Sequence, residues 1–161
     1  MKILIYLIIV FLAVIVGAIL GVAIIGKQYE KHCMVISKKA DWLSDMSVMQ
    51  TRWLWLLQNG KTVADYCNNN GYRRVAIYGM SEIGYALLDE LKSGGVEIPY
   101  CIDRNADSIF AKVDVKRPDE VPDEVDVVIV AVIQYYDSVK NTLEKRVTCP
   151  IVSLADIVWE A

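Results

Sequence analysis

The fold of this chain is decided by residues 75–84, which read Val-Ala-Ile-Tyr-Gly-Met-Ser-Glu-Ile-Gly. The first four residues form an apolar run typical of a strand that is buried on both faces of a parallel sheet. Gly79 follows the run directly. An amphipathic pattern marked by Ile83 and Leu87 then continues to Gly94. A strand, a glycine turn and a helix in direct succession indicate the start of a βαβ unit.

The rest of the C-terminal half repeats this alternation of apolar runs and helical segments. We predict strands at 98–102, 113–115, 127–133 and 150–153, one helical turn at 118–121, and helices at 136–145 and 154–159. Strands that alternate with helices predict a parallel sheet joined by right-handed crossovers. The prediction is therefore an α/β, Rossmann-like sheet with strand order of about 3-2-1-4-5.

The glycine turn has the spacing of a phosphate-binding loop. In the dinucleotide fingerprint Gly-x-Gly-x-x-Gly, the first glycine permits a tight turn, the second admits a pyrophosphate and the third allows close packing of helix on strand. Gly79 and Gly84 take the first and third places, and Ser81 takes the second. The Ser81 side chain narrows the space for a pyrophosphate, although its hydroxyl can bond a phosphate oxygen. Glu82 suits a helix N-terminus but repels a phosphate placed there.

An acidic residue follows at the end of the second predicted strand. Asp103 lies 24 residues after Gly79, where an acid accepts hydrogen bonds from a ribose diol, whereas the adjacent Arg104 can pair with a phosphate. The candidate cofactor-binding residues are Gly79, Met80, Ser81, Glu82, Ile83, Gly84, Asp103, Arg104, Ala131, Val132 and Tyr135. The expected ligand is NAD or a nucleotide sugar. The alternative is that the two glycines serve packing only and that Asp103 caps the turn at 103–107.

Three stretches of the chain resemble the Rossmann-like, NAD(P)-binding-type domains of bacterial surface-polysaccharide proteins, namely residues 71–84, 100–107 and 149–154. Such domains occur in nucleoside-diphosphate-sugar epimerase/dehydratase-like proteins, in acyltransferases that act on nucleotide sugars, and beside methyltransferase and glycosyltransferase domains. The resemblance covers roughly residues 60–158 and implies a role in cell-envelope polysaccharide biosynthesis. We expect no substrate-binding half of the kind that complete epimerases carry.

The N-terminal segment has the character of a membrane anchor. Ile3 to Ile25 are 23 consecutive residues without charge and without Asn, Gln, Ser or Thr. A helix of that length covers roughly 34 Å, enough for a hydrocarbon core of about 30 Å. A cleaved signal peptide is the alternative, but its apolar region is normally about 7–15 residues. Four lysines between positions 27 and 39 follow the run, so we predict a single-pass protein of the cytoplasmic membrane with its C-terminal domain in the cytoplasm.

Two helix faces in the N-terminal third suggest contacts. Ala13, Gly17 and Gly21 form a ridge of small residues that predicts a homo-oligomer, unless these residues are there simply because they are common in membrane helices. Farther along, residues 27–58 contain no Pro or Gly and carry an apolar stripe. The stripe consists of Val35, Trp42, Met46, Met49, Trp53 and Leu56. We predict an amphipathic helix that packs on the following domain or lies along the membrane surface. The expected organisation is an anchor at 1–26, this juxtamembrane helix at 27–59 and the Rossmann-like domain at 60–161.

Composition excludes several other function classes. The chain has 17 Lys+Arg against 20 Asp+Glu, so it is not a nucleic-acid binder held by bulk positive charge. His32 is the single histidine, and neither a Ser-His-Asp triad nor a zinc site is expected. Tyr136 and Lys140 match the Tyr-x-x-x-Lys pair of short-chain dehydrogenases. They follow the fourth strand rather than the fifth, so we interpret the match as a coincidence.

These observations favour a membrane-anchored module that binds a nucleotide, dinucleotide or nucleotide sugar in polysaccharide biosynthesis, without self-contained catalysis and without a metal. One alternative is a ligand-free scaffold that tethers a glycosyltransferase or methyltransferase through Trp42, Met46, Met49 and Trp53. Another is an NAD-dependent, epimerase-like oxidoreductase subunit that needs a partner chain.

Overall fold

The structure is a computed structural model that describes residues 2–122 and 124–161. It describes their side chains except at positions 4, 6–10, 12–14, 16, 18 and 19. The part of the chain so described belongs to two compact units, Met1–Ser44 and Asp45–Ala161.

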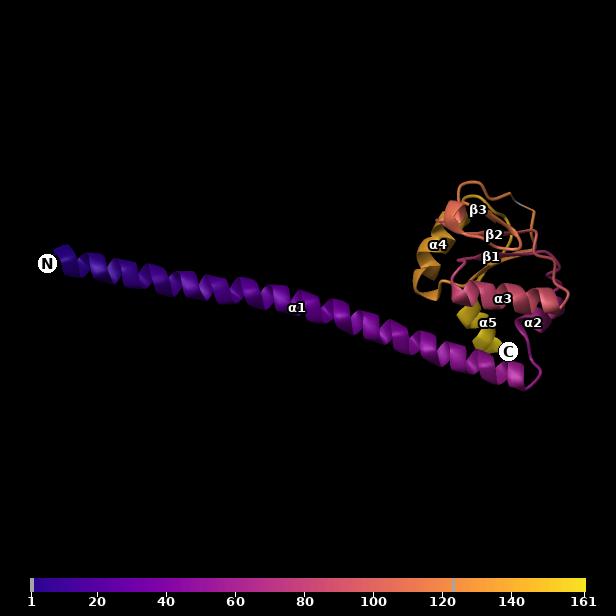
Figure 1. Cartoon of the computed structure of the whole chain (residues 1–161), viewed down its shortest axis with the longest axis horizontal. Coiled ribbons are helices and arrows are strands. Elements are labelled where there is room, and N and C mark those ends of the chain that lie inside the picture. Colours follow the sequence, from indigo (N-terminus) through magenta and orange to yellow (C-terminus); the bar gives the residue numbers. More distant parts are fainter. Residues whose placement is uncertain (1, 123) are drawn as a thin grey trace. The chain divides into compact units, whose positions relative to one another are not determined.

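Over its described residues, the first unit is one helix. This helix, α1, spans Lys2–Gln58, so the predicted anchor and juxtamembrane helix form one uninterrupted element (Figure 1). Among the described residues we found no helix that is both long enough and apolar enough to cross a membrane. The predicted anchor and its ridge of small residues include side chains outside the described part, among them that of position 13, and both stay predictions.

The second unit is built on a parallel sheet that has five strands within the described residues, in the order β3-β2-β1-β4-β5. The strands are β1 (Val75–Tyr78), β2 (Tyr100–Ile102), β3 (Asp114–Lys116), β4 (Val127–Val130) and β5 (Ile151–Ser153). β1 lies at the centre, where Tyr78 is in register with Ile102 on one side and with Val130 on the other. The predicted α/β class and strand order are confirmed, although β2 and β4 are shorter than expected.

Helices connect the strands much as the sequence predicts. They are α2 (Val63–Asn69), α3 (Glu82–Ser93), α4 (Tyr136–Leu143) and α5 (Leu154–Glu160), with short 3-10 turns η1 (Ala106–Ser108) and η2 (Ile133–Tyr135). The predicted helical turn at 118–121 is wrong, because this segment is a non-helical turn closed by the Glu120 N–H and the Arg117 carbonyl. Pro122 accounts for the difference, since a residue that precedes proline is disfavoured in helical conformation.

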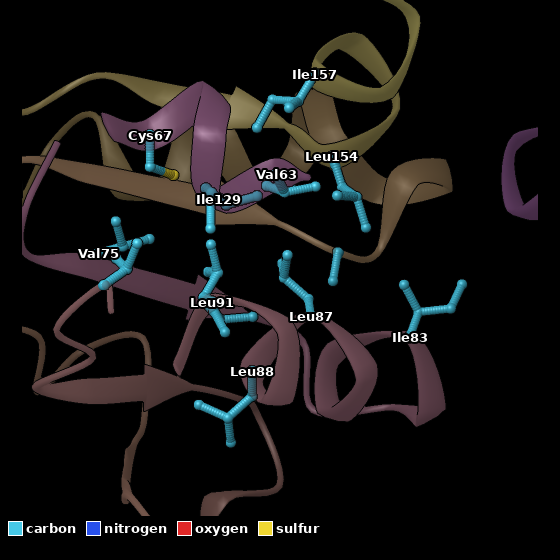
Figure 2. Close-up of a cluster of buried hydrophobic side chains, with 14 of the residues drawn as sticks. Val63, Cys67, Val75, Ile83, Leu87, Leu88, Leu91, Ile129, Leu154 and Ile157 are labelled. Carbon is cyan, nitrogen blue, oxygen red and sulfur yellow. The ribbon is translucent and has the colours of Figure 1, made fainter. Parts of the chain in front are cut away.

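The sheet is covered by helices on both faces (Figure 1). Successive residues of a strand point to opposite faces. Ile77 and Ile129 belong to a core cluster with α2, α3, α5 and the end of α1, while Tyr78 and Val130 pack with α4. Figure 2 shows the first cluster, in which side chains of α2, α3 and α5 meet strand residues such as Ile129. The carboxyl ends of the strands are left at one edge of this three-layer arrangement.

The last turns of α1 belong to the core of the second unit. Met49, Trp53 and Leu56 are buried there, so this part of the apolar stripe packs on the domain as predicted. The Glu90 carboxylate of α3 fastens the contact, because it accepts hydrogen bonds from Trp53 Nε1 at 2.7 Å and from the Val63 N–H at 2.5 Å. Desolvation raises the pKa of Glu90, and the two hydrogen bonds partly oppose that rise.

Candidate functional site

The turn between β1 and α3 depends on Gly79. Its φ of +98° lies in the left-handed region that side chains disfavour. A Cβ atom at this position would also lie 2.6 Å from Cγ1 of Val132. The Gly79 N–H donates to the Ile102 carbonyl at 2.8 Å, which ties the turn to the end of β2. Both backbone conformation and space therefore require glycine here.

Gly84 allows α3 to start directly against this turn. A Cβ atom on Gly84 would lie 2.0 Å from the Gly79 carbonyl oxygen, which is backbone and cannot rotate away. Close approach of helix and strand is the role of the third glycine in the dinucleotide fingerprint. The two glycines therefore have a packing role whether or not a ligand binds.

The N-terminus of α3 opens at the carboxyl edge of the sheet. Ser81 is the N-cap residue and has extended backbone, with φ of −87° and ψ of −176°. Within the described residues, its hydroxyl makes no capping hydrogen bond. Ser81 and Glu82 are both exposed. Because the first N–H groups of a helix lack intrahelical partners, this end of α3 offers hydrogen-bond donors to an anion. The negative charge of Glu82 would repel that anion.

Asp103 connects the turn to the end of β2. One carboxylate oxygen accepts a hydrogen bond from the Met80 N–H at 2.8 Å, and the other accepts one from the Asn105 N–H at 2.8 Å. The second bond is the turn cap that the alternative interpretation expects. A carboxylate offers about four lone-pair sites, and Asp103 is only half-buried, so it keeps acceptor capacity for a diol.

The remaining candidates divide into core and surface residues. The side chains of Met80 and Ile83 lie in the hydrophobic core, so only the backbone atoms of these two residues are at the carboxyl edge of the sheet. Ala131 is buried and its N–H donates to the Tyr78 carbonyl at 2.9 Å. Arg104 and Tyr135 are exposed. The structure thus brings the glycine turn, Asp103 and Val132 together and leaves Arg104 and Tyr135 on the surface.

The Tyr-x-x-x-Lys match has a structural role. The Tyr136 hydroxyl donates to the Ile151 carbonyl of β5 at 2.9 Å in a partly buried setting. Lys140 Nζ lies 3.8 Å from Glu144 and 5.8 Å from the centre of the Tyr136 ring. The hydroxyl of a proton-transfer tyrosine has to face a substrate, and this one is occupied by the backbone of a neighbouring strand.

The buried cysteines are not nucleophiles. Burial raises the pKa of Cys67 to about 12 and that of Cys101 to about 11, so both thiols are protonated at neutral pH. Among the described residues, we also found no group of His, Cys, Asp and Glu side chains placed to hold a metal ion.

Two exposed aromatic clusters were missed by the sequence interpretation. The first joins Tyr85 of α3 to the loop after η1, where the Tyr85 hydroxyl donates to the Phe110 carbonyl at 3.3 Å and the Phe110 side chain is 95% exposed. Tyr85 and Phe110 are 25 positions apart, and no local pattern connects them.

The second cluster lies where α1 meets α5. The Arg52 guanidinium carbon stands 4.7 Å from the centre of the Trp55 ring and 5.8 Å from that of the Trp159 ring. Both rings are exposed, and with Ser47, Val48 and Thr51 they line a hollow of about 430 Å³. The sequence does show that Trp55 cannot share the buried face of Trp53, but not that Trp159 joins it.

Comparison of the chain with protein-family models, with curated proteins and with solved structures found no match. The functional argument therefore depends on the geometry and on the residues themselves.

Proposed function

We propose that the carboxyl edge of this sheet binds a ribose-containing nucleotide ligand, a dinucleotide or a nucleotide sugar. The observation that carries the proposal is the hydrogen bond between Asp103 and the Met80 N–H. It holds an acidic side chain at the end of β2 beside the turn that opens α3. Recognition of a nucleotide needs an acceptor for the ribose and donors for the phosphates within one ligand length, and this edge supplies both.

Each part of the ligand has a chemical counterpart. The ribose diol would donate to the free lone pairs of Asp103, and a phosphate would lie at the N-terminus of α3. In the part of the chain that the structure describes, the exposed Ser81 hydroxyl makes no capping bond, so it can donate to that phosphate. Val132, which packs over Gly79, would contact the ligand from the β4 side.

The setting we propose is a membrane-anchored protein of cell-envelope polysaccharide biosynthesis with its domain in the cytoplasm. The anchor is supported by the uncharged run from Ile3 to Ile25 and by the lysines that follow it. The polysaccharide context is supported by the resemblance of residues 71–84, 100–107 and 149–154. The module would present its ligand and not transform it, in keeping with the structural role of Tyr136.

Titration calorimetry on the full chain tests the ligand site, with NAD, NADP and UDP-sugars as ligands. At least one should bind, and Asp103→Ala should weaken that binding at least about tenfold, because it removes a charged acceptor. Asp89→Asn, on an exposed part of α3, is the matched control and should bind as the parent does. A folded chain that binds none of the three would contradict the proposal.

A second candidate function, a scaffold, is favoured by the Trp55–Trp159 surface. The scaffold surface expected from the sequence consisted of Trp42, Met46, Met49 and Trp53. It is wrong for Met49 and Trp53, because both side chains are buried in the core of their own domain. Exposed tryptophans around an arginine are typical of protein interfaces. Co-purification of a glycosyltransferase or methyltransferase that Trp159→Ala abolishes would favour this function.

A further inference from the structure

α1 is exposed at every position from 22 to 41, and large apolar side chains recur along it every seven residues. Val22, Tyr29, Ile36 and Leu43 stand seven residues apart, with exposed fractions of 71%, 70%, 60% and 48%. This is not the stripe that the sequence interpretation selected, which lies one residue earlier in each heptad. Large apolar side chains exposed at a constant heptad spacing indicate that a further surface covers this face.

Small residues alternate with the large ones along the same face. Gly26, Cys33 and Ala40 are also seven residues apart and all are exposed. Together the two series define what we call the α1 seam: Val22, Gly26, Tyr29, Cys33, Ile36, Ala40 and Leu43. The average spacing of 3.5 residues is that of a left-handed coiled coil, so the surface that fits the seam is another helix with the same repeat.

The shape of the helix surface fits a side chain from such a partner. A hollow of about 360 Å³ on α1 is lined by Ile25, Gln28, Tyr29, His32, Cys33 and Ile36. The small Cys33 lies between the larger Tyr29 and Ile36. In coiled coils, each core side chain inserts between four residues of the facing helix. The hollow has the composition of such an acceptor site.

Charge decides which helix can occupy the seam. Six charged residues lie between positions 22 and 43, and all of them are off the seam: Lys27, Glu30, Lys31, Lys38, Lys39 and Asp41. In a parallel, in-register pair of identical helices, the flanking residues of one copy meet those five positions later in the other copy. Lys39 then faces Ser44, and His32 faces Ser37, so no like charges oppose each other.

We propose that two copies of this chain pair in parallel through the α1 seam. A second copy supplies the required repeat and the required apolar residues, and its flanking residues place no like charges opposite each other. A membrane surface would also accept an apolar helix face. However, Gly26 and Ala40 offer little apolar area to lipid, while they let a second backbone approach closely. The seam is also distinct from the Gly17–Gly21 ridge, since Gly21 is turned about 100° from Val22 around the helix.

Oxidative cross-linking of the full chain in detergent, with copper phenanthroline as oxidant, tests the pairing. Cys33 is exposed, whereas Cys67 and Cys101 are buried. In the parallel pair, Cys33 faces its own counterpart, so a disulfide-linked dimer should form and Cys33→Ser should abolish it. In that background, Ala40→Cys on the seam should restore the dimer. Lys38→Cys, on the opposite side of the helix, should not restore it.

Sedimentation of the same detergent-solubilised chain provides the independent measurement. The parent should sediment as a dimer, and Ile36→Asp should raise the dimer dissociation constant at least tenfold. Lys38→Asp is the control for added charge and should leave the dimer intact, and both variants should unfold thermally as the parent does. Three results would overturn the proposal: a monomeric parent, equal cross-linking at positions 38 and 40, or an Ile36→Asp dimer as tight as the parent. A monomer whose Cys33 is shielded from an aqueous maleimide only by phospholipid vesicles would assign the seam to the membrane instead.

Discussion

The apolar residues of α1 are buried in one part of the helix and exposed in the other. In the second unit, Met49, Trp53 and Leu56 are buried against α2 and α3. In the first unit, the large side chains of Tyr29 and Ile36 are 70% and 60% exposed. Most of the stability of a helix comes from packing one apolar face, not from helix propensity. The second unit therefore holds its part of α1 with its own residues, whereas the described residues of the first unit leave its large apolar side chains uncovered.

The largest effect is expected where the second unit is packed most tightly. Gly84→Ala places a Cβ atom against the Gly79 carbonyl oxygen, so either α3 or the turn must move. We expect a loss of about 3 kcal/mol or more in the free energy of unfolding, since overpacking against backbone cannot relax by a rotamer change. Urea denaturation of the full chain measures it.

Gly60→Ala is the matched control for that change. Gly60 has a φ of +71° but no atom within 4 Å of its Cβ position, so only backbone strain remains. That strain costs about 1 kcal/mol. Equal losses for Gly84→Ala and Gly60→Ala would show that the helix–turn contact is not as tight as described.

The second-largest loss of stability is expected for one of two neighbouring leucines on α1. Leu56 is 2% exposed and Leu57 is 39% exposed. Leu56→Ala should lower the free energy of unfolding by about 3 kcal/mol because it leaves a cavity, and Leu57→Ala by less than about 1 kcal/mol. Thermal and urea unfolding of both variants measure the difference. Similar losses would mean that the end of α1 is not held in the core.

The smallest effect is the pH dependence of the stability that Glu90 contributes through its hydrogen bonds to Trp53 and Val63. Burial raises the pKa of Glu90 above its ordinary value, so the folded chain holds this proton more tightly than the unfolded chain. The stability contributed by Glu90 is therefore complete below the ordinary glutamate pKa and falls as pH rises through the raised one. Glu90→Gln should remove this decline.

At neutral pH the same variant should cost about 1 kcal/mol, because Trp53 and Val63 donate to different carboxylate oxygens of Glu90, and in Gln one of these positions is an NH2 group that cannot accept. Stability measured from pH 4 to 8 checks both expectations. Glu97→Gln, at an exposed ion pair with Arg74, is the control and should change stability by less than about 0.5 kcal/mol. A Glu90→Gln profile parallel to that of the parent would contradict the assignment.

The fold was predictable because its signals are local. The run from Val75 to Tyr78, the turn at Gly79 and the helix that follows each carry their own pattern, and alternation alone restricts the topology. The helical turn predicted at 118–121 failed for a reason that is also local. Pro118 suits the first position of a helix, but Pro122 disfavours helical conformation at Val121, and the second effect prevails.

The candidate site was predictable in position but not in its contacts. Spacing placed Asp103 at the end of β2, but its bond to the Met80 N–H depends on how β1 and β2 are aligned. In the same way, Val132 reaches Gly79 only because β4 pairs with β1 after a long crossover. The apolar stripe on α1 could be selected from the sequence, but not the point where it leaves the core: Met49, Trp53 and Leu56 are buried, whereas Val35 is exposed.

The fastening of α1 has a mechanical consequence. Tension applied along α1 would reach α3 in part through the hydrogen bond between Trp53 and Glu90, beside the packed Met49 and Leu56. Glu90 lies eight residues from the first residue of α3, which is about 12 Å along the helix. A pull on α1 would therefore load the body of α3 as well as the chain that continues into α2.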